Sequence, residues 1–94
     1  MIAAQQATQY RSTWRSAERE EMARFLKRYV LSGHRVVGIG RIEVALADRR
    51  PAFMETFSQS DSQRHRLISH AMRDLRWRAN TWGRYGRISS WVQD

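Results

Sequence analysis

Basic and hydrogen-bonding side chains recur along residues 61–75 at the three- and four-residue spacing of a helix. At about 100° per residue, one arc of such a helix carries Ser62, Arg66, Ser69, His70 and Arg73. Arginine forms planar, paired hydrogen bonds to phosphate oxygens and to guanine edges, and serine and histidine add further donors and acceptors. We therefore expect this arc to contact the backbone and the base edges of a nucleic acid.

A second group of arginines surrounds a glycine-bounded segment near the end of the sequence. Gly83-Arg84-Tyr85-Gly86 lies between two stretches of alternating side chains, and its glycines can adopt the positive φ of tight turns. We predict a β-hairpin over residues 76–92 with a basic tip. Its candidate contact residues are Arg76, Arg78, Arg84, Tyr85 and Arg87.

The aromatic residues of this hairpin have two interpretations. Rings that lie among arginines can stack on unpaired bases, but a small domain also needs large apolar anchors. We expect Trp77 and Trp91 to be core residues, and Tyr85, at the apex of a loop, to be exposed and to contact a sugar or a partner protein. Because side chains alternate along a strand, Ile88 and Trp91 should lie on opposite faces.

The charge of the whole chain indicates a polyanionic partner. Lys and Arg number 17 against 9 Asp and Glu, which gives a net charge of +8, and 16 of the 17 basic residues are Arg. From Ser62 to Gln93 there are seven Arg and a single acidic residue, Asp74. Such an excess favours phosphate backbones. The alternative is a solvated basic surface that serves solubility, and the scarcity of carboxylates argues against it.

Several other kinds of chemistry are not expected. The chain has no cysteine, which excludes disulfides, thiolate metal sites and cysteine nucleophiles. His65 and His70, five residues apart, lie on different sides of a helix, so we predict no metal site. Gly38-Ile39-Gly40 lacks the third glycine of a dinucleotide fingerprint because Glu43 stands there. Without paired carboxylates or an activated nucleophile, we expect no enzymatic activity, no catalytic residue and no cofactor.

The rest of the pattern predicts the elements that position these residues. A chain of 94 residues supports one core, so we assign residues 1–13 to a flexible arm and residues 14–94 to a single domain. The first half of the chain is predicted to form a helix over 16–31 that stops at Gly33, a short strand or extended connection within 34–40, and a helix over 41–50 that Pro51 ends. An irregular segment over 52–60 with a turn at its end, a helix over 61–75 and the hairpin follow.

This order of elements resembles the winged helix-turn-helix family of DNA-binding domains over roughly residues 16–92. The resemblance is most specific where Met72-Arg73-Asp74-Leu75-Arg76-Trp77 runs into a hairpin tipped Gly83-Arg84-Tyr85-Gly86-Arg87. It implies an α+β, mainly helical fold with a recognition helix at about 61–75 in the major groove and a wing at about 76–92. The resemblance makes Arg66, Ser69, His70 and Arg73 groove contacts and Arg84 and Arg87 wing contacts. Residues 51–60 depart from the family, because its usual turn is shorter.

These observations predict a protein that binds double-stranded DNA, as a transcriptional regulator or a recombination or accessory factor of a bacterium or phage. We expect it in the cytoplasm, on the nucleoid, because the sequence has no apolar run that suits a membrane span or a signal peptide. An alternative is a phage-encoded inhibitor or interaction module that binds a host nucleoprotein complex. A protein partner and a homodimer both stay open, whereas Glu18, Glu20 and Glu21 argue against a membrane-surface helix.

Overall fold

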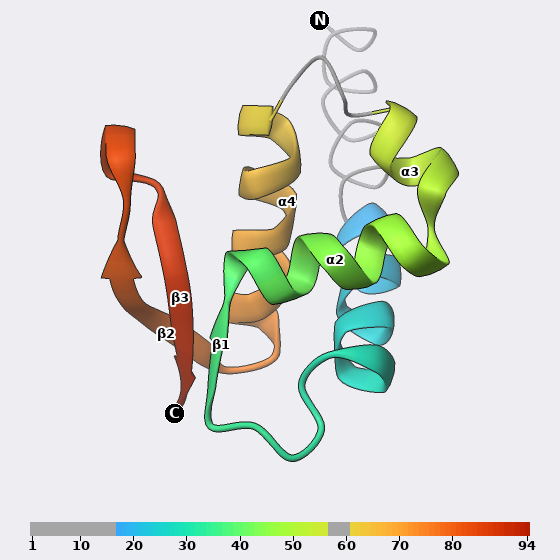
Figure 1. Ribbon diagram of the computed structural model, residues 1–94. Coiled ribbons are helices and arrows are strands. Elements are labelled where there is room, and N and C mark those ends of the chain that lie inside the picture. Colours follow the sequence, from blue (N-terminus) through green and yellow to red (C-terminus); the bar gives the residue numbers. More distant parts are fainter. Residues whose placement is uncertain (1–16, 57–60) are drawn as a thin grey trace, which may run out of the picture.

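The computed structural model describes residues 17–56 and 61–94, which form a small α+β domain (Figure 1). The first helix occupies residues 17–29. The elements that follow it are β1 (Val36–Gly38), α2 (Ile39–Arg49), α3 (Pro51–Thr56), α4 (Asp61–Asp74), β2 (Trp77–Trp82), the short 3₁₀ turn η1 (Arg84–Gly86) and β3 (Ile88–Gln93). The structure contains a helix at each of the three predicted positions, 16–31, 41–50 and 61–75, and the predicted hairpin is confirmed. The predicted arm at 1–13 lies outside the described residues.

The first helix packs one face into the core and is followed by a glycine turn. Met22, Phe25 and Leu26 recur at helical spacing and are buried. After the helix, the N–H of Leu31 donates a hydrogen bond to the carbonyl of Leu26 at 2.9 Å. The chain then turns at Gly33, whose φ of +81° is a conformation that side-chain-bearing residues rarely adopt. The helix ends at residue 29, before the predicted end at residue 31, and Gly33 lies in the turn that leads to β1.

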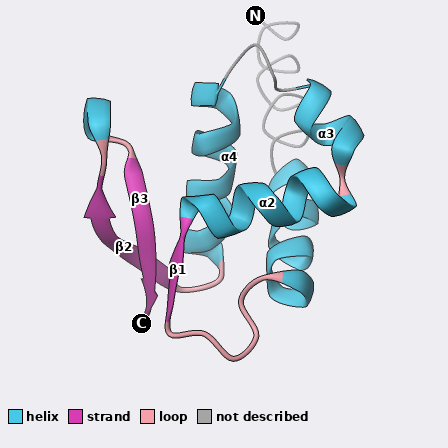
Figure 2. Cartoon of the chain, viewed as in Figure 1, coloured by secondary structure: helices cyan, strands magenta, loops and turns pink. Residues whose placement is uncertain are grey.

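The three strands form one antiparallel sheet in the order β1-β3-β2 (Figure 2). On the central strand β3, Trp91 pairs with Val37 of β1 on one side and with Ala79 of β2 on the other. The short strand predicted within residues 34–40 is therefore an edge strand of the sheet that contains the hairpin. This pairing ties the hairpin to the start of α2, because β1 runs into that helix without a break.

The alternation predicted along β3 is wrong, because the hairpin register is irregular. Ala79 pairs with Trp91 and Thr81 pairs with Ser90, so Asn80 is an extra residue on β2. The next pair is Trp82 with Ile88, so Ser89 is an extra residue on β3. Such bulges reset which face a side chain occupies. As a result Trp91 is buried and Ile88 is packed against the same core, although an even alternation would place them on opposite faces.

The segment that follows α2 is a helix rather than an irregular connection. Pro51 does end α2, which stops at Arg49, but it also begins α3, because proline lacks an N–H and is tolerated in the first turn of a helix. Phe53 and Met54 of α3 are partly buried against the core. α3 over Pro51–Thr56 thus takes up the first part of the extra length between the second and third predicted helices, and the turn predicted at its end falls on residues 57–60, outside the described residues.

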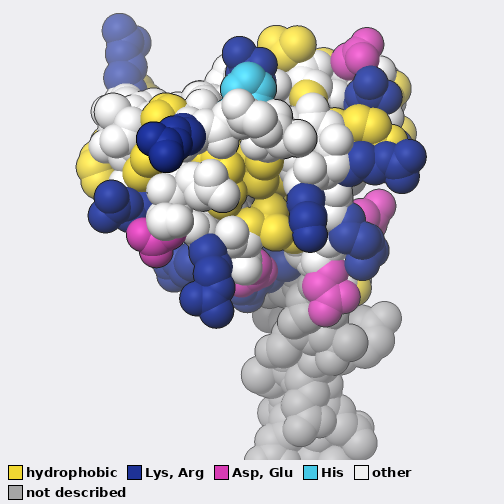
Figure 3. All heavy atoms as spheres, turned by 90° about the horizontal axis from the view of Figure 1, so that it is seen from below, with side chains coloured by type: hydrophobic (Ala, Val, Ile, Leu, Met, Phe, Trp, Pro, Cys, Tyr) yellow, Lys and Arg dark blue, Asp and Glu magenta, His cyan; other side chains and the backbone are white. Residues whose placement is uncertain are grey.

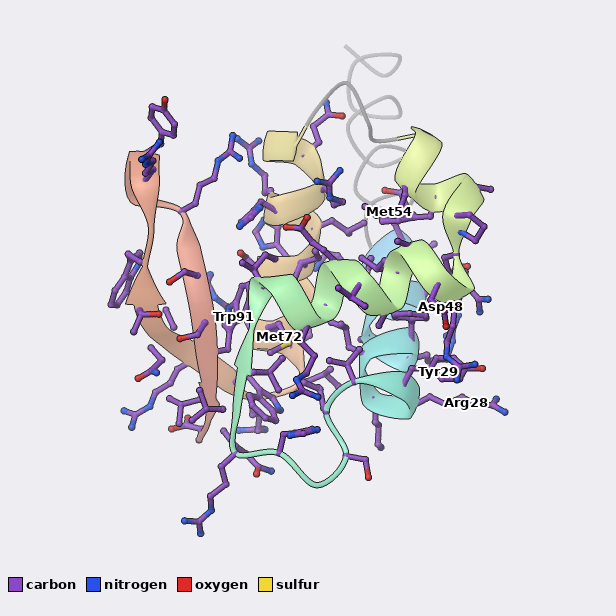
Figure 4. All side chains as sticks on the ribbon, in the orientation of Figure 1. Arg28, Tyr29, Asp48, Met54, Met72 and Trp91 are labelled. Carbon is purple, nitrogen blue, oxygen red and sulfur yellow. The ribbon has the colours of Figure 1, made fainter. Side chains whose placement is uncertain are left out.

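The core lies between the helices and one face of the sheet. Its sheet side includes Trp77 and Trp91, both predicted as core residues and both confirmed, and its helix side includes Ile68 and Met72 of α4. Figure 4 shows Met72 and Trp91 between α4 and the strands. The hairpin projects beside the helices, with η1 at its far end (Figure 1). This arrangement is compatible with a winged-helix domain.

Candidate nucleic-acid interface

A groove of about 320 Å³ separates the exposed face of α4 from the hairpin. One wall comes from α4 and the other from the end of η1 and the start of β3. The residues that line it are His65, Arg66, Ser69, His70, Arg73, Gly86, Arg87 and Ile88. This lining contains three arginines, two histidines and no carboxylate, so the groove presents positive charge and hydrogen-bond donors.

The groove brings together five of the residues that the sequence analysis selected. Arg66, Ser69, His70 and Arg73 come from α4, as the helical spacing predicted, and Arg87 comes from the hairpin. These two sets are separated by more than ten residues in the sequence and share a surface because β2 returns the chain alongside α4. The predicted helix face and one residue of the predicted wing, Arg87, therefore line the same groove.

The other selected residues lie outside this groove. Arg84 and Tyr85 are exposed in η1 at the tip of the hairpin. Arg76 is exposed in the turn after α4, and Arg78 is exposed on β2, where its Nε lies 3.8 Å from Oδ1 of Asp94. The side chain of Ser62 lies outside the described part of the chain. Contact of Arg76 and Arg78 with a ligand in the groove would require that ligand to extend beyond it.

His65 is a groove residue that the sequence analysis considered only as a metal ligand. Its Nε2 lies 3.3 Å from the carbonyl oxygen of Ile88 and donates a hydrogen bond to it when it carries the hydrogen. This bond joins α4 to β3 across the floor of the groove and so positions the hairpin against the helix. Among the described residues, no group of three or more metal-ligating side chains is arranged to hold an ion.

Arg64 is a buried arginine of α4 that lies outside the predicted contact arc. It is 7% exposed, and its Nη2 lies 3.6 Å from Oε2 of Glu43 on α2. The signal was present in the sequence, because Arg64 stands four residues before the buried Ile68 and seven before the buried Ala71, on the apolar side of α4. Arg64 therefore ties α4 to α2 and is not part of the groove.

The single acidic residue of this region is held by an arginine from the first helix. Asp74 at the end of α4 accepts two hydrogen bonds from Arg19, at 2.6 Å from Nη2 and 3.1 Å from Nε. A two-bonded guanidinium and carboxylate pair of this kind largely cancels its own charge. The carboxylate that follows Arg73 in the sequence is thus neutralised, and the lining of the groove itself adds no negative charge.

The same surroundings act on His70. Its partial burial lowers its pKa below the usual 6.5, and the guanidinium groups of Arg19, Arg73 and Arg66 lower that pKa further, while the carboxylate of Asp74 raises it. A lowered pKa means that the folded domain holds the neutral imidazole against protonation. An anion in the groove would offset the repulsion from these arginines.

Folding stability is therefore expected to fall as the pH drops below about 6.5, because the unfolded chain then binds a proton at His70 more readily than the folded chain does. At higher pH both states are neutral at this position, and the contribution is fully present. Urea denaturation midpoints of the wild type and of His70→Gln, measured at neutral and mildly acidic pH, test this. The wild type should lose more stability on acidification, and an equal loss would contradict the assignment.

A second hollow, at the end of the domain opposite the hairpin tip, has a different character. Its lining mixes basic residues such as Lys27 and Arg35 with apolar ones such as Leu31, Leu75 and Trp77. In Figure 3, which views this end of the molecule, lysine and arginine side chains are interspersed with carboxylates around a hydrophobic centre. The lining of this hollow, like that of the groove, contains no carboxylate, but it carries one arginine and one lysine, whereas the groove between α4 and the hairpin carries three arginines.

No helix within the described residues is both long and apolar enough to cross a membrane. Comparison of the chain with models of protein families, with curated proteins and with solved structures gives no significant match.

Proposed function

We propose that this protein binds double-stranded DNA through the groove between α4 and the hairpin, in the manner of a winged-helix domain. The observation that carries the proposal is the convergence of Arg66, Arg73 and Arg87, from two separate elements, on one groove whose lining has no carboxylate. Arginine-lined surfaces of this kind bind phosphate backbones through charge-assisted hydrogen bonds. The +8 charge of the whole chain adds long-range attraction for the same ligand.

The shape of α4 supports a division of roles within the complex. The helix has 14 residues, about 21 Å of length, and a helix with its side chains is about as wide as the major groove. Arg66 and Arg73 on its exposed face would then reach base edges, while Arg84 and Arg87 of the hairpin would contact phosphates of the adjoining backbone. Ser69 and His70 add hydrogen-bonding groups between the two arginines.

The biological role that this binding best supports is that of a small transcriptional regulator or recombination accessory factor of a bacterium or phage, acting on the nucleoid. The proposed groove would let the domain read DNA. Within the described residues, no group of metal-ligating side chains suggests metal-dependent hydrolysis. A regulator of this size would act by occupying a site on DNA or by bending it.

Binding to a duplex of random sequence is expected at low salt, with an affinity that falls steeply as salt is raised from about 50 to about 200 mM. If Arg84 and Arg87 contact phosphates, log K should fall against log salt with a slope of about −2 or steeper. Fluorescence anisotropy of a labelled duplex measures this directly. Absence of binding at low salt would reject the proposal, and a flat salt dependence would reject the role of the arginines.

A further inference from the structure

The tip of the hairpin places an aromatic ring where neither the backbone nor packing favours one. Tyr85 has φ 61° and ψ 21°, in the left-handed region, and its side chain is 92% exposed. Glycine and asparagine suit that backbone conformation, whereas tyrosine is strained in it. A ring that gains no burial in compensation has no evident role in stabilising the fold, which points to a role in binding.

The turn that carries this ring has a defined geometry. The N–H of Gly83 donates to the carbonyl of Arg87 at 2.7 Å, and the N–H of Arg87 donates to the carbonyl of Arg84 at 3.3 Å. Gly86, next to Tyr85, also has a positive φ, of 71°, and lines the groove together with Arg87. Tyr85 thus directly precedes the groove residue Gly86, with Arg84 before it and Arg87 two residues after it.

We propose that Tyr85 stacks on an unpaired base, so that the protein prefers duplex DNA that contains an open position, such as a bubble, to a fully paired duplex. This inference rests on the proposed DNA-binding function. An aromatic ring stacks on the face of any base, and flanking arginines can hold the phosphates on either side of it. Inside an intact duplex the base faces are covered by their neighbours, so a ring as exposed as Tyr85 would find a partner only where a base is unstacked.

The chemistry around the ring favours a nucleic acid over a protein surface as its partner. A protein hot spot usually surrounds an aromatic anchor with further apolar contacts. Here the neighbours of Tyr85 in sequence are Arg84 and Gly86, and the adjoining surface is the arginine-lined groove. A polyanion with exposed base faces matches both the ring and the charge.

The test compares a random-sequence duplex with the same duplex carrying a central bubble that contains a fluorescent purine analogue. The wild type should bind the bubble about 5- to 100-fold more tightly than the paired duplex, the range given by one base-aromatic stack, and should quench the analogue. Tyr85→Gly should bind both DNAs equally and leave the analogue unquenched. Tyr85→Phe, which keeps the ring, should retain the preference and the quenching.

Two controls keep the result interpretable. Tyr85→Gly suits the backbone at this position, so its denaturation midpoint should equal or exceed that of the wild type. Trp82→Thr removes the other exposed ring of the hairpin, on β2, and should leave the bubble preference unchanged. If the wild type shows no preference, or if Tyr85→Gly keeps it or Trp82→Thr abolishes it, the inference is wrong. If neither DNA binds at low salt, the proposed function fails as well.

Discussion

Truncation of Trp91 to alanine is expected to destabilise the domain by roughly 3 to 5 kcal/mol. The side chain is 1% exposed and is the largest that the described residues bury so completely. It projects from the central strand β3, which pairs with both β1 and β2, so its indole supports the contact between the whole sheet and α4. A loss of this size is a large part of the 5 to 15 kcal/mol, roughly, by which domains are usually stable.

The matched control is the exposed tryptophan of the same hairpin. Trp82 is 61% exposed, so Trp82→Ala removes a ring of the same size with little loss of packing, and it should change the free energy of unfolding by no more than about 1 kcal/mol. Urea denaturation followed by far-ultraviolet circular dichroism measures both variants. Similar losses in the two variants would show that the sheet does not depend on Trp91 for its packing on the helices.

The buried position of Trp91 shows where strand periodicity fails to predict which face of the sheet a side chain occupies. The buried residues Met22, Phe25 and Leu26 of the first helix and Ile68, Ala71 and Met72 of α4 follow helical spacing, because nothing interrupts the 3.6-residue period of either element. The hairpin obeys no single period, since a bulge near Asn80 and another near Ser89 each shift the register by one residue. Bulges depend on pairing between strands, which a single sequence does not display.

The helix α3 was not predicted from the sequence, for a related reason. A proline ends one helix and is also well suited to begin another, so Pro51 is consistent with either outcome. The choice depends on whether the residues that follow can pack, and Phe53 and Met54 do so against a core built by distant parts of the chain. Local propensity alone does not contain that information.

The candidate site, too, could be predicted from the sequence only in part. The α4 wall of the groove could be predicted from helical spacing because it belongs to one element, and the basic tip could be predicted from its glycines. The meeting of the two walls could not, because it depends on the bond from His65 to the carbonyl of Ile88 and on the sheet register. Arg64 shows that charge alone does not place a residue at the surface, because its position on the apolar side of α4 leaves it buried.

Reversing the charge on both walls of the groove should abolish most DNA binding. The double variant Arg66→Glu, Arg87→Glu removes two guanidinium groups and adds two carboxylates where the proposed duplex lies. Hydrogen bonds to charged groups contribute roughly 1.5 to 3 kcal/mol each, so loss of the two should weaken binding roughly a hundredfold or more at physiological salt. Anisotropy with the random-sequence duplex measures the change.

The control separates position from net charge. Arg28 and Arg49 both lie over the ring of Tyr29, and Figure 4 shows Arg28 and Tyr29 on the side of the domain away from the hairpin. Arg28→Glu, Arg49→Glu changes the net charge by the same amount as the groove variant, because each substitution replaces one positive charge with one negative charge. A duplex seated between α4 and the hairpin would feel this change only through long-range attraction, which salt screens within about 8 Å.

The two double variants should therefore differ most clearly at physiological salt, where screening suppresses the distant charges and leaves direct contacts in place. At low salt the distant pair should also lose some affinity, because the overall attraction of the chain for DNA is weaker. Denaturation midpoints establish that both variants are folded, with a small loss expected in the control from its stacking on Tyr29. Equal weakening by both pairs at physiological salt would mean that DNA responds to net charge alone, and the groove would then not be the binding surface.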